Sequence, residues 1–262
     1  MENKINKRVV TARVLENKQI QTGIFKMIIE SKEIAEECKA GQFVNVYMKN
    51  KATLLPRPIS ICDYDENTII LVYKVIGKGT GEMSDYKEND KISITTPLGN
   101  GFHINQTENA MLIGGGIGIA PLIALAKELK NNNVRNIIAV LGYEEETYLI
   151  DEFKEVVNEV YITTDKETNW YKGTVVDLIE EKNLFEMIKE KGVNKYACGP
   201  KPMLKVLSKC TMSIGDDIEI SMEERMGCGY GACVGCAIKT KMGTQKVCKD
   251  GPVFLASQII WE

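Results

Sequence analysis

Four of the eight cysteines in this chain stand close together near its C-terminal end, and their spacing constrains the fold more than any other feature. The pattern is C-x4-C-x2-C-x11-C, formed by Cys228, Cys233, Cys236 and Cys248. Three thiolates from one loop and a fourth from further along the chain are the ligand arrangement of plant-type [2Fe–2S] clusters. The loop is also rich in glycine, which lets backbone N–H groups approach the sulfurs.

A structural zinc site with four thiolates is the alternative interpretation of these cysteines. Zinc sites usually repeat C-x2-C pairs, whereas here the first gap is four residues long. In a reducing compartment, a dense cysteine cluster indicates a metal or cofactor site more often than disulfides. We therefore predict that the four cysteines ligate one [2Fe–2S] cluster.

Charge and hydropathy exclude several classes of protein. With 33 basic and 36 acidic side chains the net charge is −3, which argues against nucleic acid as the main partner. The first eight residues have no apolar core, so we expect no signal peptide. The longest uncharged stretch, 109–126, contains four glycines and a proline and is shorter than the about 20 apolar residues of a membrane span. We expect a soluble cytoplasmic protein without a membrane partner.

Hydrophobic periodicity divides the chain into three parts and predicts a multidomain α+β protein. Residues 1–104 contain short strand-like runs and one helical candidate at 82–87, which predicts a small antiparallel β-barrel. Strands and helices alternate over 105–215, which predicts an α/β domain with a parallel sheet. Residues 216–262 carry the cysteines and too few apolar side chains for a core of their own.

A glycine run between a predicted strand and a predicted helix indicates a phosphate-binding loop. The run comprises Gly114, Gly115, Gly116, Gly118 and Pro121. Glycines permit close approach of a diphosphate, and the following helix offers N–H groups that have no partner. Proline replaces the third glycine of the usual dinucleotide fingerprint and suits the first turn of a helix. A glycine turn without a ligand is the alternative.

Nucleotide choice depends on the segment after the next predicted strand. Glu144 stands in an acidic segment, 143–146, that has no Arg or Lys. A carboxylate at this place can bind a ribose 2′-hydroxyl, whereas a 2′-phosphate requires a cation. The segment favours NAD over NADP, unless Glu144 is simply solvated.

The segment 55–60 in the predicted barrel combines an arginine with two prolines. An arginine held beside prolines at the start of a strand suits a bidentate phosphate contact, and Ser60 could present its hydroxyl to a ring nitrogen. Taken alone, the motif equally fits a surface arginine in a turn.

Three motifs taken together carry a resemblance. R-P-x-S on a barrel, then G-G-x-G-I-x-P, then Cys198-Gly199-Pro200 resemble the ferredoxin–NADP reductase superfamily. With the cysteine loop and the segment 248–254, the chain is similar to the electron-transfer subunits of type B dihydroorotate dehydrogenases, in order over nearly its whole length. Related small subunits of ferredoxin transhydrogenases and sulfide dehydrogenases often carry Asp where Cys228 stands.

The resemblance implies a role for each motif. The barrel would bind FAD, the α/β domain would bind NAD as co-substrate, and the C-terminal domain would hold the [2Fe–2S] cluster. Cys198, Gly199 and Pro200 would lie near the nicotinamide, although a packing role for Cys198 is the alternative. The residues expected to contact FAD are Arg57, Pro58, Ile59, Ser60, Val72, Tyr73, Lys74, Gly79 and Thr80.

The resemblance also implies a partner. These three modules use up the chain, so the dihydroorotate site would lie on an FMN-containing catalytic subunit, in a heterotetramer of two copies of each. Electrons would pass from dihydroorotate to FMN, [2Fe–2S], FAD and NAD⁺ in pyrimidine biosynthesis. One alternative is the same electron chain in a ferredoxin transhydrogenase or sulfide dehydrogenase complex. Another is a zinc-stabilised binding module with a vestigial nucleotide loop.

Overall fold

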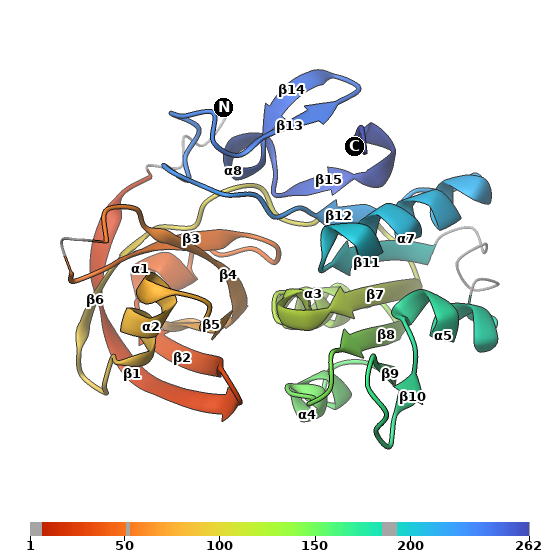
Figure 1. Cartoon of the computed structure of the whole chain (residues 1–262), viewed down its shortest axis with the longest axis horizontal. Helices are drawn as coiled ribbons and strands as arrows, with labels where there is room; N and C mark the ends of the chain where they lie inside the picture. Colours follow the sequence, from red (N-terminus) through yellow and green to blue (C-terminus); the bar gives the residue numbers. More distant parts are fainter. Residues whose placement is uncertain (1–6, 51–52, 185–192, 262) are drawn as a thin grey trace.

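The N-terminal part of the chain forms a closed antiparallel barrel in the computed structural model, which describes residues 7–50, 53–184 and 193–261 (Figure 1). Alternate residues of each strand face inward, so that Val14, Met27 and Leu71 are fully buried in the barrel core. The strands in barrel order are β1 (Val9–Gln21), β2 (Ile24–Glu30), β5 (Thr68–Lys74), β4 (Arg57–Tyr64), β3 (Phe43–Tyr47) and β6 (Lys91–Thr95). Two short helices, α1 (Lys32–Ala35) and α2 (Lys78–Ser84), join these strands.

The second part of the chain forms a mostly parallel sheet, to which the described residues contribute seven strands. Their near-continuous apolar runs are buried on both faces, as in doubly covered parallel sheets. In sheet order they are β10 (Tyr171–Lys172), β9 (Glu159–Thr164), β8 (Asn136–Tyr143), β7 (Asn109–Gly115), β11 (Val193–Cys198), β12 (Glu219–Ser221) and β15 (Val253–Leu255).

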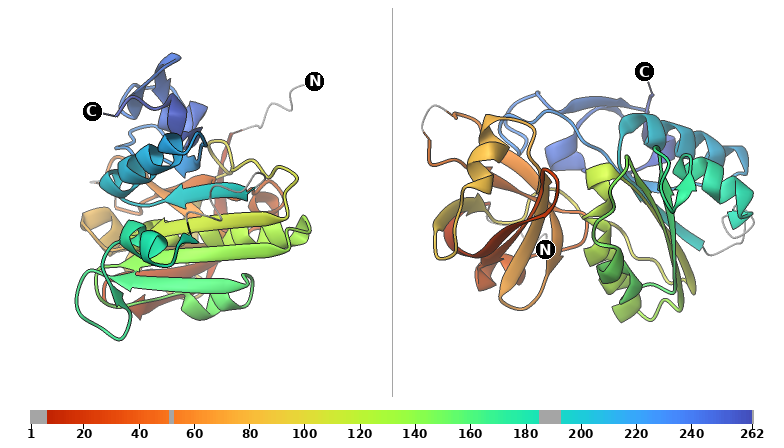
Figure 2. Two further views of the ribbon diagram at one scale, coloured as in Figure 1. Left: turned by 90° about the vertical axis from the view of Figure 1, so that its right-hand side faces the viewer. Right: turned by 60° about the horizontal axis from the view of Figure 1, so that its bottom comes forward.

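Helices cover both faces of this sheet, as Figures 1 and 2 show. The face toward the barrel carries α3 (Leu122–Asn131) and α4 (Ile150–Lys154), whose apolar side chains pack with barrel residues such as Ile24 and Val72. The opposite face carries α5 (Val175–Glu181) and α7 (Lys201–Ser213). The barrel and the sheet therefore share one continuous apolar interface.

The strand order reverses direction beside β7. The chain proceeds from β7 outward to β8 and β9, and then β11 is added on the other side of β7. In open α/β sheets, ligands bind outside the carboxyl ends of the strands at this kind of switch point. The segments that follow β7 and β11 are the glycine run from Gly114 and the turn from Cys198.

The C-terminal segment is joined to the sheet rather than attached as a separate lobe. β12 pairs in parallel with β11, and β15 returns antiparallel to β12. Between them lie a hairpin, β13 (Ala237–Thr240) and β14 (Gly243–Lys246), and the short helix α8 (Val247–Asp250), and the one-turn helix η2 (Ala256–Gln258) follows. Its buried side chains belong to the same apolar cluster as α5 and α7, which explains why it needs no core of its own.

The expected α+β architecture is confirmed: a barrel, a parallel sheet and a small cysteine-rich region. The domain boundaries at 104 and 215 stay a prediction. The helix expected at 82–87 lies instead at Lys78–Ser84, because the Thr80 hydroxyl accepts from the N–H groups of Ile76 and Gly77 and starts the helix earlier. Of the helix expected at 175–189, residues 185–189 lie outside the described residues. None of the described helices has the length and apolar character required to cross a bilayer.

Candidate functional site

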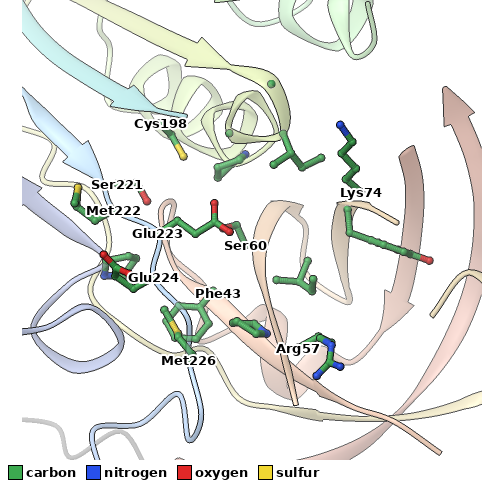
Figure 3. Close-up of a pocket in the computed structure, with 18 of the residues that line it drawn as sticks. Phe43, Arg57, Ser60, Lys74, Cys198, Ser221, Met222, Glu223, Glu224 and Met226 are labelled. Atoms are coloured by element: carbon green, nitrogen blue, oxygen red, sulfur yellow. The ribbon is translucent and has the colours of Figure 1, made fainter. Parts of the chain in front are cut away.

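A cavity of about 810 Å³ lies where the barrel faces the carboxyl ends of β7 and β11. Figure 3 shows Arg57, Ser60 and Lys74 on its barrel side and Cys198 with Ser221 on its sheet side. The cavity brings together all the predicted cofactor-binding residues except Gly79, Gly114 and Glu144. Segments separated by more than a hundred residues in sequence thus meet around one space.

The barrel wall of the cavity is built by the starts of two elements. Arg57 begins β4, and its Nη1 donates to the carbonyl of Leu55 at 2.8 Å, which fixes the guanidinium at the cavity edge. Gly79, in the first turn of α2, lies directly beneath this guanidinium, since a Cβ there would be 2.6 Å from its Nη2. Gly79 therefore does not line the cavity but allows Arg57 to pack over α2. This arrangement places cationic and N–H groups together, as a diphosphate requires.

The sheet wall is built by two turns packed against each other. The glycine run leaves β7, forms the one-turn helix η1 (Gly116–Ile119) and enters α3 after Pro121. A Cβ on Gly118 would lie 2.6 Å from the carbonyl carbon of Cys198, so only glycine permits this approach. Gly114 lies at the end of β7, beneath Ile119, and does not reach the cavity.

Cys198 ends β11 with its side chain buried beside Ser221 of the neighbouring strand. Burial raises the pKa of the Cys198 thiol to about 12, although a hydrogen bond with the Ser221 side chain opposes the shift. At neutral pH the side chain is a neutral thiol. It can pack against a flat ring but does not supply a thiolate nucleophile.

Glu144 lies away from the cavity, in the exposed segment that follows β8. Its neighbour Glu145 forms an ion pair with Lys166, which follows β9, at 2.6 Å. The sequence shows no cation within 143–146, but the fold supplies one from the adjacent strand. The side chain of Lys166 is engaged by Glu145, and Glu144 adds to the negative potential around it.

Sequence reasoning missed one wall of the cavity. Residues 221–226, between β12 and the first clustered cysteine, line the cavity together with Pro252. Within this wall Glu224 forms an ion pair with Lys201 at the start of α7, and Glu223 lies close enough to Cys198 to influence its ionisation. No motif marks this segment. Its place follows from the pairing of β12 with β11, which local spacing does not reveal.

The same wall leads directly into the cysteine loop, where Cys233 contacts Cys228 and Cys236 contacts Cys248. The backbone N–H of Cys233 points at the Cys228 sulfur at 3.4 Å, and the Cys236 and Cys248 sulfurs are 3.3 Å apart. In the described residues, no three Cys, His, Asp or Glu side chains gather at one point where a single metal ion could sit. Cysteines that contact each other two by two suit a binuclear centre, in which each iron takes two protein ligands.

The loop also favours thiolate at its first cysteine. Burial raises the pKa of Cys228, but N–H groups of Cys233, Tyr230 and Ala232, together with the Cys233 thiol, outweigh this and lower the pKa to about 6. Backbone N–H groups aimed at sulfur are also the contacts that tune an iron–sulfur centre. The donor set therefore fits the predicted cluster.

Comparison with protein families matches two segments of the chain. Residues 223–260 match the iron–sulfur cluster binding domain of dihydroorotate dehydrogenase B, and residues 112–209 match the oxidoreductase NAD-binding domain. The first range spans the cysteine loop and the part of the cavity wall that leads into it. The second spans the strands and turns of the sheet wall.

Relatives match the chain over nearly its full length. The electron transfer subunit of dihydroorotate dehydrogenase B (NAD(+)) from Caldanaerobacter subterraneus subsp. tengcongensis is 40% identical over 95% of this chain and 98% of its own. The subunit of the same name from Clostridium perfringens is 38% identical over 92% and 94%. Among solved structures, a chain of an NADH-dependent reduced ferredoxin-NADP oxidoreductase is 32% identical with a TM-score of 0.83, covering 95% of this chain and 90% of that one.

Proposed function

This chain belongs to the family of electron-transfer subunits of dihydroorotate dehydrogenase B, and from that premise we propose that it passes electrons from a dihydroorotate-oxidising partner subunit to NAD⁺. The observation that carries the proposal is the single cavity shared by the Arg57 motif, the glycine run and the Cys198 turn. One wall of this cavity continues without interruption into Cys228. In this proposal, the sites of the three redox groups lie next to one another.

We assign FAD to the barrel side of the cavity. Arg57 and Thr80 would hold its diphosphate, with Gly79 leaving room for the Arg57 guanidinium, and the β5 segment from Val72 to Lys74 would flank its ring. Bound flavin exchanges electrons singly or in pairs, and so links a two-electron nicotinamide to a one-electron iron–sulfur centre. The protein's task is to orient these groups and to exclude water from the space between them.

We assign NAD to the sheet side of the cavity. The glycine run presents backbone N–H groups at the start of α3 toward the diphosphate. The neutral Cys198 side chain and the Gly199–Pro200 turn form a small, uncharged surface on which a nicotinamide ring can rest. We place the ribose toward Glu144, where the Glu145–Lys166 pair leaves an excess of negative charge.

We assign the [2Fe–2S] cluster to Cys228, Cys233, Cys236 and Cys248, and the docking of the partner to the surface around them. The name of the relatives implies a catalytic partner. We propose that this partner carries FMN, that two copies of each chain assemble, and that electrons pass from dihydroorotate through FMN, the cluster and FAD to NAD⁺.

A second candidate function is the same electron chain in a ferredoxin-coupled complex. It is supported by the likeness to the NADH-dependent reduced ferredoxin-NADP oxidoreductase. The higher identity of the dihydroorotate dehydrogenase subunits, and a cysteine rather than an aspartate at position 228, favour the first proposal.

Reconstitution tests the proposal. The chain is co-expressed with an FMN-containing subunit that oxidises dihydroorotate, and dihydroorotate-dependent NAD⁺ reduction is measured for the complex and for each subunit alone. We expect NAD⁺ reduction only from the complex. Electron transfer to ferredoxin without any response to dihydroorotate would support the second candidate. A purified chain that contains zinc and shows neither flavin nor iron–sulfur absorption would refute both.

A further inference from the structure

Strand β3 contacts the cysteine segment through the side chains that point out of the barrel. Val44 and Val46 face the barrel core, so Phe43, Asn45 and Tyr47 face outward. Phe43 packs in the apolar cluster that contains Cys236 and Cys248, and Tyr47 lies close enough to Cys228 to interact with it electrostatically. The C-terminal segment passes over this strand in Figure 1.

Asn45 makes the central polar contact of this surface. Its side chain is fully buried, and its Nδ2 donates to the carbonyl of Cys228 at 2.9 Å. Its Oδ1 is buried without a hydrogen-bond partner. A buried amide with an unsatisfied oxygen is costly, and an apolar side chain of the same shape would suit folding at least as well. The contact with Cys228 is what the amide supplies and an apolar side chain would not.

The cysteine loop is shaped to accept this amide. Gly229, directly after Cys228, has a φ of +78°, and a Cβ on it would lie 2.8 Å from the Asn45 Oδ1. Both the backbone conformation and the close approach therefore require glycine at this position. The amide and the glycine together fix where the loop turns at its first cysteine.

The same strand pair carries the predicted flavin motif. Asn45 stands opposite Pro58 in the β3–β4 ladder, and its neighbour Val46 stands opposite Arg57. Paired strands are only about 4.8 Å apart. A residue fixed on β3 is therefore rigidly placed with respect to the Arg57–Ser60 motif on β4.

We propose that Asn45 is a positioning residue, which holds the first cysteine of the cluster loop against the strand pair that carries the flavin motif. The inference rests on the proposed function, since it takes Cys228 as a cluster ligand. Asn45 acts through the Cys228 carbonyl. It sets the orientation of that cysteine, which influences how tightly iron is held and at what potential it is reduced.

The test compares the intact protein with the variant Asn45→Leu, which keeps the side-chain shape but removes the donor. Three quantities are measured: iron release to a chelator, the electron paramagnetic resonance spectrum of the reduced centre, and its midpoint potential. We expect iron release at least about tenfold faster, altered g-values and a shifted potential, with flavin content unchanged. Ile92→Val, a change inside the barrel core, away from the outward-facing Asn45, controls for lost barrel stability.

A second pair of variants changes glycines of the cysteine segment and leaves the barrel sequence intact. Gly229→Ala places a methyl group where the Asn45 amide lies, and we expect it also to accelerate iron release. Gly243→Ala is the matched control, because Gly243 in the β13–β14 hairpin also has a positive φ, +100°, and an added Cβ there would meet no other atom within 4 Å. In the Asn45→Ala variant the space beside Gly229 is vacant. Adding Gly229→Ala to it should therefore accelerate iron release less than it does in the wild-type protein.

The possible outcomes distinguish the positioning role of Asn45 from the proposed function. Spectra, potentials and release rates of Asn45→Leu that match the wild type would overturn the positioning role while leaving the proposed function intact. Equal effects of Gly229→Ala and Gly243→Ala on iron release would also overturn it. A wild-type protein without iron and acid-labile sulfide would overturn the proposed function, and the inference with it.

Discussion

Cys198 and Cys228 both stand beside a glycine turn, and both border the same cavity wall, yet the protein treats them in opposite ways. Cys198 ends a sheet strand, with its thiol buried beside Ser221, and burial raises its pKa to about 12. Cys228 lies in a loop whose backbone N–H groups point at its sulfur, so that its pKa falls to about 6 despite burial. One turn therefore keeps a neutral thiol, and the other prepares a thiolate.

The difference shows that backbone geometry, rather than the residue type, decides the chemistry of a cysteine. In β11 the N–H groups at the carboxyl end of the strand are committed to neighbouring strands. In the cysteine loop, glycines with positive φ turn the N–H groups inward, toward the sulfur. The first environment suits contact with a flat ring, and the second suits a metal.

The largest expected effect is loss of the metal centre when a cysteine of the cysteine loop is replaced. Cys233→Ser removes one member of the Cys228–Cys233 pair, and we expect it to strip or destabilise the cluster while leaving much of the flavin bound. Iron and flavin analysis of the purified variant measures both. Cys210→Ser, at a half-buried cysteine of α7 outside the loop, should keep its iron. Unchanged iron occupancy in Cys233→Ser would contradict the ligand assignment.

The buried Cys198 thiol should resist alkylation. With a pKa of about 12, the thiolate fraction of Cys198 at pH 8 is about one in ten thousand, roughly three orders of magnitude below that of an ordinary thiol. Its alkylation rate should rise about tenfold per pH unit up to pH 10, because only the thiolate reacts. Peptide mapping after iodoacetamide treatment follows this rate. A plateau near pH 9 would show that Cys198 is exposed and that the contrast with Cys228 is wrong.

A change in the barrel should lower flavin affinity without affecting Cys198 or Cys228. Arg57→Ala would remove the proposed charge-assisted contact with the flavin diphosphate; such a contact contributes roughly 1.5–3 kcal/mol, so flavin affinity should fall about ten- to a hundredfold. Iron content should stay as in the wild type. Flavin dissociation is followed by fluorescence, with Arg13→Ala, an exposed barrel arginine paired with Glu30, as control. Equal dissociation rates for both variants would place the diphosphate away from Arg57.

The smallest expected effect concerns the nucleotide that approaches the Cys198 turn. Lys166 is engaged by Glu145, so the acidic segment toward which we propose to place the ribose keeps excess negative charge, which would repel a 2′-phosphate. We expect kcat/KM for NAD(H) to exceed that for NADP(H) by at least about tenfold, or roughly 1.4 kcal/mol. Glu145→Gln frees Lys166 and should lower the ratio of kcat/KM for NAD(H) to that for NADP(H). Equal values for the two nucleotides in the wild-type diaphorase assay would show that the acidic segment does not face the ribose.

The motifs could be predicted from sequence because each is local. The glycine run and the Arg57 motif each lie within a few residues, and the cysteine spacing lies within one segment from Cys228 to Cys248, so that turn geometry and ligand number are enough to recognise them. The barrel and the alternating sheet also followed from hydrophobic period, since apolar runs of the right length mark the strands.

What the sequence did not reveal depends on pairing between distant strands. The cavity wall at 221–226 exists because β12 adds to β11, and Lys166 reaches Glu145 because β9 lies beside β8. Asn45 is similar: a single polar residue in an apolar strand carries no motif, and its meaning appears only where Cys228 lies against it. The helix at Lys78–Ser84 was misplaced because its glycines have low helix propensity and its start depends on the Thr80 hydroxyl.

The pairing of β12 and β15 with the main sheet has a consequence for how such a chain can be shortened or recombined. A chain cut after residue 215 would lose the strand that covers β11 and would leave an unpaired parallel edge open to solvent. It would also uncover apolar side chains of α7 that now pack against the C-terminal segment. The cysteine-rich segment therefore cannot be removed without exposing the sheet that it covers. Transplanting the nucleotide-binding part alone would produce an aggregation-prone fragment, and any functional chimera must exchange both parts as one piece.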